Sequence, residues 1–456
     1  MMLPMMDVFL ALLGALVIGN IGLLAAYRKP AQFALNNAVL LLLLISISYI
    51  YATGQSTVYL GFLSINQFSL FFMLLFTIGM LLANFLYYEF AENYCELAML
   101  GALSLVGMLI VAGSTSIVTI FLGLELVSMP MVFSVLLAKR SLEAAAKLFI
   151  MASVSIALFS FAMALDIGGA GTLNLGASTY TYLMLFVAVI FIAALGFETS
   201  VFPFNVLIPD VYEGSPAYLT GTMGGINKTA GFAALVQILI LVFIAYKSAF
   251  LVVALLSVFT MFYGNIAALM QRNLKRLLAY SSISQAGYVL IGIATYSPEG
   301  LAGALFQVFA HMFIFIGMLA IVAWLETRNK HTIDDIAGLS RENRYTAFAL
   351  TLFMLSLIGL PFTTGFVGKL LIFLGAVNGG LLWLALLGII NSIISVYYYA
   401  KPIMSMYALE KHKKGVGMPG LVSVVVALCL LITLLFGVYP QPMINLVTAA
   451  AAHLFA

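Results

Sequence analysis

The sequence predicts an all-α polytopic membrane protein with about fourteen transmembrane helices. Of its 456 residues, 64% are hydrophobic and only 8% are charged. A soluble domain carries about 25% charged residues, so this chain cannot cover itself with a water-compatible surface. Apolar runs of roughly 20 residues recur along its whole length, and each is long enough to cross a bilayer as a helix.

Polar breaks between the apolar runs set the predicted spans. The first seven are 8–26, 36–53, 66–88, 95–113, 115–138, 143–165 and 179–205. The next seven are 216–245, 248–271, 276–296, 300–325, 345–374, 378–408 and 418–440. The gaps are short, and the longest polar connector is 326–344, so we expect one membrane domain over 1–456.

The N-terminus and the cysteines exclude two other interpretations. Residues 1–26 lack the positively charged start and small-residue cleavage pattern of a signal peptide, so they are predicted to be a retained first span. Cys95 and Cys429 lie far apart in the chain and have no metal-ligand spacing. The sequence therefore predicts no disulfide framework, metal site or iron–sulfur cluster on this chain.

Basic residues are strongly biased to one side of the predicted membrane. Alternate loops on one side hold Arg28, Lys29, Lys139, Arg140, Arg272, Lys275, Arg276, Arg328, Lys330, Arg341, Arg344, Lys411, Lys413 and Lys414. The opposite loops hold only Lys247. Cytoplasmic loops are enriched in Lys and Arg, so this bias predicts an even number of spans with both termini outside. The short chain without a targeting peptide suggests a prokaryotic plasma membrane.

Five charged residues fall inside predicted spans. They are Glu125, Lys147, Glu198, Lys228 and Lys369. A charge at a helix centre costs about 2.5–3.5 kcal/mol on insertion scales, so a bundle that only had to hold together would use apolar residues there. These side chains either pair as structural ion locks or form a proton relay with water; we favour the relay.

Two prolines mark predicted breaks in spans that carry charges. Glu198 lies five residues before Pro203, and Lys369 lies eight residues after Pro361. Proline removes a backbone donor, which lipid tolerates only where protein or water satisfies the freed groups. Each proline alone is equally compatible with a simple kink, but the pair is typical of a transporter with inverted repeats. His311, in FAHMFIFIG, is either a relay member or a hydrogen-bonded packing residue.

A series of motifs in the middle of the chain resembles one known family. In order these are FLGLELVSMP, KRSLEAAAKLFI, PFNVLIPDVYEGSP, INKTAGFAAL, QRNLKRLLAYSSISQAGY, GLPFTTGFVGK and SVYYYAKP. Together they resemble the N-type antiporter-like membrane subunit of respiratory complex I and related dehydrogenases, from about residue 95 to 405. The DVYEGSP and SLEAAAK forms favour the N-type over the L-type and M-type relatives.

The resemblance implies a detailed architecture. It implies helices 1–3 in 1–94, a first repeat of helices 4–8 in 95–245, a second, inverted repeat of helices 9–13 in 246–408, and helix 14 in 409–456. Helices 7 and 12 would be discontinuous. It also implies proton-transfer roles for Glu125, Lys147, Lys228 and Lys369 in coupling quinone or similar carrier reduction to proton pumping.

The resemblance further implies that the redox chemistry lies elsewhere in a complex. Flavin and iron–sulfur clusters are expected on partner subunits, with no cofactor on this chain. The expected partners are other membrane-arm subunits and the lipid bilayer, and no nucleic acid. The chain would be a non-redox subunit of a proton-pumping oxidoreductase, without independent catalysis.

Three positions depart from the family pattern. Glu198 stands where the family usually has lysine, Asn205 replaces a histidine common after the proline, and Gln285 replaces another histidine. Two carboxylates, Glu125 and Glu198, therefore stand where a glutamate–lysine pair is expected. We expect Lys147 or Lys228 to supply the missing positive charge and Glu198 itself to carry a proton.

Two alternative functions remain open from the sequence. One is a subunit of a multisubunit cation/proton antiporter or membrane-bound hydrogenase, which shares this helical unit; sodium-dependent activity or co-purifying hydrogenase subunits would favour it. The other is a scaffold that only holds neighbouring subunits, which predicts that neutralising Lys228 and Lys369 leaves pumping intact.

Overall fold

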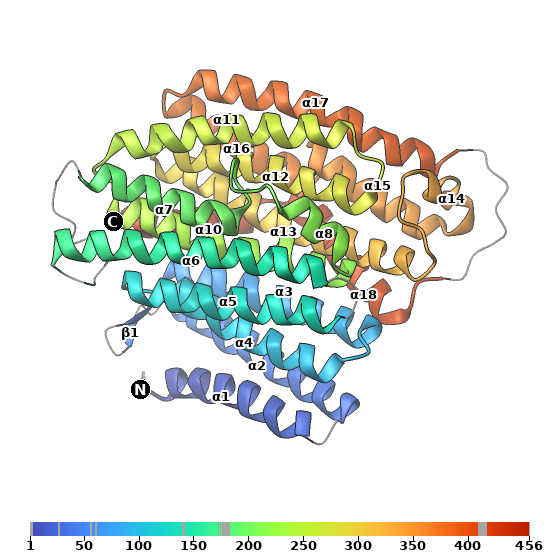
Figure 1. Cartoon of the computed structure of the whole chain (residues 1–456), viewed down its shortest axis with the longest axis horizontal. Coiled ribbons are helices and arrows are strands. Elements are labelled where there is room, and N and C mark those ends of the chain that lie inside the picture. The colour runs from blue at the N-terminus through green and yellow to red at the C-terminus, as the bar shows by residue number, and fades with distance from the viewer. Residues whose placement is uncertain are drawn as a thin grey trace.

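In the computed structural model, the helices run side by side in a single bundle (Figure 1). The structure describes residues 3–25, 28–54, 57–59, 62–138, 142–171, 173, 175, 183–408 and 417–455. The predicted basic residues Lys139, Arg140, Lys411, Lys413 and Lys414 lie outside this part of the chain.

Six long helices and a short hairpin form the first third of the bundle. The helices are α1 (Leu3–Ala25), α2 (Lys29–Thr53), α3 (Gln67–Phe90), α4 (Tyr94–Gly113), α5 (Ile117–Leu137) and α6 (Leu142–Ala170). Between α2 and α3, β1 (Thr57–Tyr59) and β2 (Leu63–Ile65) pair antiparallel. Asn66 and Ser69 form a capping box at the start of α3, and Ser116 and Thr119 form another at α5. These side chains satisfy free backbone N–H groups, which fixes where both helices begin.

The next span is interrupted as the sequence predicts. Helix α7 (Leu183–Thr199) ends, the chain turns, and the short helix α8 (Ile208–Gly214) follows. The interruption begins before Pro203, at Ser200, whose φ of 60° is left-handed. A continuous span then passes through α9 (Ala217–Gly221), the π-helix η1 (Thr222–Asn227), α10 (Lys228–Gln237) and the π-helix η2 (Ile238–Val242).

Three long helices and a compact connector follow. The helices are α11 (Lys247–Leu269), α12 (Leu274–Ala294) and α13 (Pro298–Glu326). Every residue in the most apolar 18-residue window of α12 and of α13 is buried, so these two helices form the centre of the bundle. The predicted polar connector 326–344 contains the 3-10 helix η3 (Asp334–Ile336) and α14 (Leu339–Glu342).

A second interrupted span and three more helices complete the chain. Helix α15 (Arg344–Ile358) ends before Pro361, and α16 (Thr364–Asn378) begins after it. Gly359 follows α15 with a φ of 103°, a conformation that favours glycine. The remaining helices are α17 (Leu382–Met406), α18 (Gly420–Val438) and α19 (Gln441–Phe455). The apolar pattern predicts one helix over 418–440, so α19, which packs on α3 and α13, is an addition.

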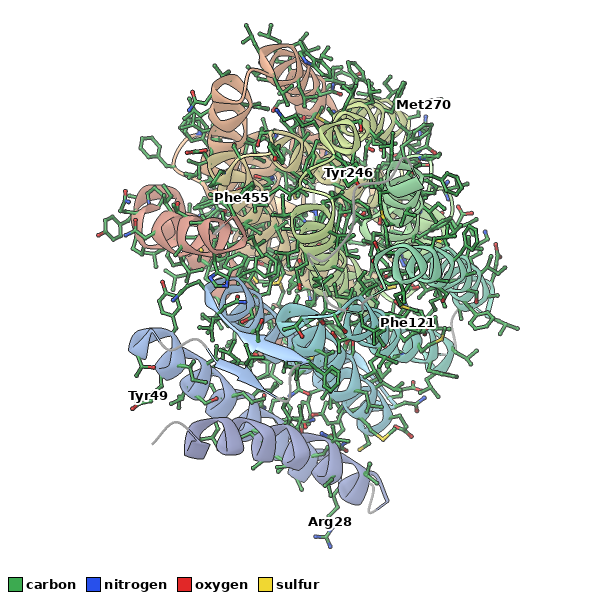
Figure 2. The ribbon with its side chains drawn as sticks, turned by 90° about the vertical axis from the view of Figure 1, so that its left-hand side faces the viewer. Arg28, Tyr49, Phe121, Tyr246, Met270 and Phe455 are labelled. Atoms are coloured by element: carbon green, nitrogen blue, oxygen red, sulfur yellow. The ribbon has the colours of Figure 1, made fainter. Side chains whose placement is uncertain are left out.

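Length and composition place this bundle in a membrane. Among the described residues, 11 helices are long and apolar enough to cross a bilayer, and shorter apolar helices lie within α1, α7, α15 and α16. The view along the helices shows carbon-rich side chains around the perimeter (Figure 2). Large apolar residues are exposed there, including Ile45, Phe259 and Ile393. The chain is therefore an integral membrane protein whose outer surface matches lipid or other membrane subunits.

The described basic loops meet at one end of the bundle, as the charge bias predicts. Asn273 forms a β-bridge with Thr332, and Arg328 and Lys330 both pair with Glu342. The ends of α3, α5 and α13 line one cavity of about 220 Å³ with the start of α9. Helix α1 begins and α19 ends at the other end of the bundle, at the left of Figure 1.

Candidate functional site

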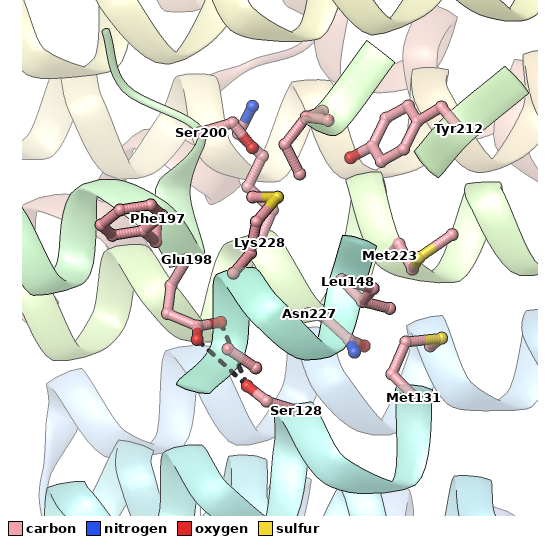
Figure 3. Close-up of a pocket in the computed structure, with 13 residues that line it drawn as sticks. Ser128, Met131, Leu148, Phe197, Glu198, Ser200, Tyr212, Met223, Asn227 and Lys228 are labelled. Carbon is pink, nitrogen blue, oxygen red and sulfur yellow. Dashed lines mark hydrogen bonds between the residues drawn. The ribbon is translucent and has the colours of Figure 1, made fainter. Parts of the chain in front are cut away.

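A cavity of about 60 Å³ lies beside the first helix break. Its polar lining comes from α5, from the α7 end, from the turn after α7, from α8 and from the η1–α10 junction. The lining residues are Ser128, Met131, Leu148, Met151, Ala152, Phe197, Glu198, Ser200, Ile208, Tyr212, Met223, Asn227 and Lys228. Two of the predicted proton-transfer residues, Glu198 and Lys228, thus lie on one cavity (Figure 3).

Glu198 is positioned by a close approach of two helices. The Ser128 hydroxyl on α5 lies 3.1 and 3.2 Å from the two carboxylate oxygens, as the dashed lines in Figure 3 show. Gly231 on α10 faces the Glu198 backbone, and a Cβ there would come within 3.0 Å of the Glu198 Cβ. The small residue lets α7 pack directly on α10, which brings the carboxylate and Lys228 to the same cavity.

Lys228 is buried at the junction of η1 and α10. Its ammonium donates to the backbone carbonyl of Ser282 at 2.8 Å and to the Ser282 hydroxyl at 3.0 Å. π-Helical turns inside α-helices frequently occur at functional sites, because they shift the direction of the following side chains. Among the described residues, no carboxylate pairs with Lys228. Neutral acceptors and the contents of the cavity therefore stabilise its ammonium.

Lys147 belongs to a different cluster from the one expected. Its ammonium pairs with Glu143 at 2.6 Å and with Asp210 at 2.7 Å. Asp210, on α8, also pairs with Arg276 at 2.7 Å, and Arg276 pairs with Glu213 at 2.9 Å. The structure therefore places Lys147 with carboxylates near the basic end of the bundle, and of the two lysines considered only Lys228 shares a cavity with Glu198.

Glu125 is half-buried on α5, three residues before Ser128. It lies close enough to Glu198 for the two carboxylates to interact electrostatically. Glu125 is thus one helical turn from the hydroxyl that bonds with Glu198.

Lys369 lies at the second helix break. It is buried on α16 and donates to the carbonyls of Leu357 at 2.7 Å and Ile358 at 3.0 Å, and to the Ser392 hydroxyl at 3.0 Å. Its ammonium also lies 4.5 Å from the centroid of the Tyr288 ring. The lysine therefore caps the carbonyl end of α15, where the helix dipole is negative. A groove of about 260 Å³ opens beside it between α16 and α17, and its lining includes Leu370 and Ile393, which are exposed on the outer face of the bundle.

His311 and Gln285 lie beside Lys228. They line one small cavity together with Lys228. The His311 ring stacks on Phe315, and its Nε2 atom has no hydrogen-bond partner in the described structure. Asn205, another position that departs from the family pattern, is fully buried, with both side-chain polar atoms equally unpartnered.

Sequence reasoning missed the neutral partners of these charges. Ser128 holds the half-buried Glu198, and Ser282 and Ser392 hold the buried Lys228 and Lys369. Serines are common in membrane helices, and nothing in their local pattern marks these three. Asp210 lies within the quoted DVYEGSP motif, so its motif was a usable signal. Within the described residues, no three His, Cys, Asp or Glu side chains gather as a metal site.

Comparisons with known proteins identify the family. Residues 114–395 match the family described as NADH:quinone oxidoreductase/Mrp antiporter, transmembrane. Because this match spans more than half of the 456 residues, the chain belongs to the family of antiporter-like membrane subunits of complex I and Mrp antiporters.

Similar relatives narrow the type within this family. The chain is 36% identical over 350 residues to NADH-quinone oxidoreductase subunit N of Bdellovibrio bacteriovorus, covering 72% of this chain and 71% of that protein. It is 31% identical over 486 residues to the subunit N of Desulfitobacterium hafniense, covering 97% and 96%. A chain of respiratory complex I from Thermus thermophilus superposes with a TM-score of 0.86 at 27% identity, covering 96% and 98%. The N-type resemblance drawn from the motifs is confirmed.

Proposed function

We propose that this chain is a proton-translocating membrane-arm subunit of a complex I-like dehydrogenase. The observation that carries the proposal is the shared cavity of Glu198 and Lys228 inside the bundle, beside an interrupted helix. Ionisable side chains within a membrane are costly and mark ion or proton pathways. The N-type relatives are subunits of NADH-quinone oxidoreductases, which supports the same assignment.

The proposed path uses the embedded charges in a fixed order. Glu125 and Glu198 exchange protons at the first break, Lys228 receives a proton from the cavity it shares with Glu198, and Lys369 exchanges protons at the second break. Lys147 and Asp210 connect the first break to the basic end of the bundle, and His311 is adjacent to Lys228. Serine hydroxyls and water complete the path, because they donate and accept at once.

The proposed architecture follows the same plan. Three further spans added to the 11 long helices give fourteen. They are α1, α7 and the interrupted span that α15 and α16 form together. Residues 95–245 and 246–408 then form two inverted five-helix repeats, each with one interrupted helix, after the N-terminal helices in 1–94. Helix α18, within 409–456, forms the last span. Broken helices at corresponding places in two repeats are typical of such transporters.

The proposed setting is a prokaryotic plasma membrane with the basic end of the bundle in the cytoplasm and both termini outside. Electrons pass through partner subunits that carry flavin and iron–sulfur clusters, and this chain performs no redox step. Its partners are other membrane-arm subunits, which cover part of the apolar perimeter.

The test is to replace Lys228 by methionine and measure protons pumped per electron in native membrane vesicles. Loss of most coupled pumping in an assembled complex is the expected result, because methionine has similar length but cannot hold a proton. Lys401→Met is a matched control, since Lys401 lies near an end of α17 and donates to the Leu269 carbonyl at 2.8 Å. Normal pumping in the Lys228→Met complex would rule out the proposal and favour a scaffold.

The family description also includes Mrp antiporters, which supports a second candidate: cation/proton exchange. Purification of the tagged chain from its native membrane in mild detergent separates the two. Recovery with quinone-site and iron–sulfur subunits supports the dehydrogenase. Recovery with antiporter subunits, together with sodium-dependent proton movement, supports exchange.

A further inference from the structure

The serine that anchors Lys228 is also in contact with a phenol. The Lys228 ammonium donates to the carbonyl and to the hydroxyl of Ser282 on α12, at 2.8 and 3.0 Å. The hydroxyl of Tyr212, on α8, interacts with the same Ser282 side chain. Ser282 is therefore a shared partner of the ammonium and of the phenol, so a change at one of them reaches the other.

Tyr212 also lines the cavity that Glu198 and Lys228 share. Its side chain is 2% exposed, so the phenol lies inside the bundle, and Figure 3 shows its hydroxyl directed toward the cavity. A cavity of about 60 Å³ has room for several water molecules. The phenol can therefore bond with water on one side and with Ser282 on the other, because a hydroxyl both donates and accepts.

Close packing and an ion pair hold the phenol in this place. A Cβ at Gly224 would come within 2.7 Å of the Tyr212 hydroxyl oxygen, so the backbone of η1 lies directly against it. The Tyr212 ring packs on Phe315 of α13, with ring centroids 6.1 Å apart. Two residues before the tyrosine, Asp210 pairs with Arg276 at 2.7 Å and fastens α8 to α12. The short helix α8 thus presents Tyr212 to the helix that carries Ser282.

Two adjacent hydroxyls can serve a lysine in both of its protonation states. A charged ammonium only donates, so the Ser282 oxygen accepts from it and the Ser282 hydrogen is donated to the Tyr212 oxygen. A neutral amine has a lone pair, so the Ser282 hydrogen turns toward the amine and the Tyr212 hydrogen turns toward the Ser282 oxygen. Both arrangements leave the serine fully hydrogen-bonded. Without the phenol, Ser282 lacks a partner in each of them, which costs free energy at a buried site.

We propose that Tyr212 is a positioning residue for proton exchange at Lys228. Acting through Ser282, its hydroxyl supplies the hydrogen-bond partner that the site needs both when the lysine is charged and when it is neutral. The exchanged proton moves between the lysine nitrogen and water in the cavity, while the hydrogens of the two hydroxyls only turn. The role rests on the proposed function, because it matters only if Lys228 carries protons.

The first test is Tyr212→Phe in the complete complex, which removes the hydroxyl and keeps the ring. We expect coupled pumping in native membrane vesicles to fall about three- to tenfold, which corresponds to about 0.7–1.4 kcal/mol. The melting temperature of the purified complex should stay within about 2 °C of wild type. Tyr94→Phe is the matched control, because Tyr94 is a buried tyrosine on α4 whose hydroxyl donates to the Asn84 side chain at 2.9 Å. It should leave pumping unchanged.

Two variants of Ser282 test whether the phenol acts through this serine. Ser282→Thr keeps the hydroxyl and should retain most of the pumping. Ser282→Ala removes the hydroxyl that the lysine and the phenol share, so its loss should be at least as large as that of Tyr212→Phe. An assembled Ser282→Ala complex that pumps better than the Tyr212→Phe complex would overturn the proposal.

A change in the acidity of the phenol separates this role from a merely structural one. A ring fluorine makes the phenol a stronger donor and a weaker acceptor at nearly the same size, which favours the arrangement with a neutral lysine. With 3-fluorotyrosine at position 212, the pH at which pumping is half-maximal on the alkaline side should move down by about 0.2–0.5. The other charged and titratable groups on the elements packed around this site are unaltered; they are Lys147, Glu198, Asp210, Arg276 and His311. The same replacement at Tyr94 should leave the pH profile in place.

The results distinguish the role of Tyr212 from the proposed function. If the Tyr212→Phe complex assembles and pumps as wild type, the phenol does not position the lysine. An unchanged pH profile with 3-fluorotyrosine would likewise reduce Tyr212 to a packing residue. Either result leaves the proposed function standing as long as Lys228→Met abolishes pumping. If Lys228→Met pumps normally, the proposed function itself fails, whatever the tyrosine variants show.

Discussion

The two interrupted helices differ in which groups hydrogen-bond the backbone that the interruption leaves unpaired. At the second break, Lys369 reaches back from α16 and donates to the carbonyls of Leu357 and Ile358. At the first break, the charged residue is Glu198, which lies before the gap and accepts from the Ser128 hydroxyl. The carbonyl end of a helix attracts a cation and repels an anion, so only the second break is capped by its charge.

Other groups satisfy the backbone at the first break. The Val201 N–H donates to the Gly196 carbonyl at 2.8 Å, and the Phe202 N–H donates to the Thr260 hydroxyl at 3.1 Å. A charge beside a broken helix can therefore stabilise the break, take part in proton transfer, or do both. Lys369 both hydrogen-bonds the backbone at its break and is available for proton transfer. Glu198 contributes little to the stability of its break. Substitutions should therefore separate stability from pumping at the first break but not at the second.

The largest expected effect is that of Lys369→Met. It removes a titratable group and the hydrogen bonds of the ammonium to the Leu357 and Ile358 carbonyls, each of which keeps one other donor. A hydrogen bond from a charged group contributes about 1.5–3 kcal/mol. We expect coupled pumping to fall by about tenfold or more, which corresponds to at least about 1.4 kcal/mol, and the purified complex to melt at a lower temperature. Proton-to-electron ratios and thermal unfolding check both parts. An unchanged melting temperature would show that the lysine does not hold the break.

Substitutions of Glu198 should have the next largest effect, and on pumping alone. Glu198→Gln keeps the shape and can still bond with Ser128, so the melting temperature should stay within about 2 °C of wild type while pumping falls several-fold. Glu198→Lys introduces the residue that the family usually has and should retain more pumping than the glutamine variant. If neither substitution changes the proton-to-electron ratio, Glu198 is not part of the path.

A smaller effect is expected for Asp210→Asn. This change weakens the pairs that Asp210 forms with Lys147 and Arg276, which are partly exposed. Partly exposed pairs contribute about 0.2–1 kcal/mol each, so we expect a two- to threefold loss of pumping and a slight loss of stability. Glu213→Gln is the control, because it removes one contact of Arg276 and none of Lys147. Equal effects of the two variants would argue that the Lys147 pair has no role at the first break.

The smallest effect is expected in the connector that leads to the second break. Burial by itself would raise the pKa of the Glu342 carboxyl, but its pairs with Lys330 and Arg328 outweigh this and lower that pKa below its ordinary value. Such a carboxylate contributes stability above the unfolded-state pKa of about 4.3 and loses it as the pH falls through the folded-state pKa. Glu342→Gln should therefore lower the melting temperature by about 1–2 °C at pH 7, and the difference should shrink as the pH falls below about 4.3 and disappear below the folded-state pKa. A difference that persists in acid would assign the effect to packing instead.

Much of the fold could be predicted from the sequence, because the relevant signals are local. The predicted span 66–88 corresponds to α3 (Gln67–Phe90), and Pro361 lies within the gap between α15 and α16. Helix α7 ends four residues before Pro203, because the turn begins at Ser200. The separate helix α19 was missed, since it starts at Gln441, between two prolines, and is less apolar than a typical span.

The candidate site could be predicted only as a set of charged residues. Glu198, Lys228 and Lys369 stand out because a charge in an apolar span is expensive, and that holds wherever the helix packs. Their partners could not be predicted in the same way. The sequence left open whether Lys147 or Lys228 lies with Glu198, and the structure pairs Lys147 with Asp210, which lies 63 residues away in the sequence.

Local patterns in the sequence were enough to predict a membrane bundle with embedded charges and two interrupted helices. Apolar length, basic-loop bias and proline position act within one span or one loop, so they can be read without knowing the neighbours. The packing of distant helices decides that Glu198 shares a cavity with Lys228 and that Lys369 caps α15. Hydrogen bonds and cavities depend on which helix faces lie together, and packing of distant segments sets those faces.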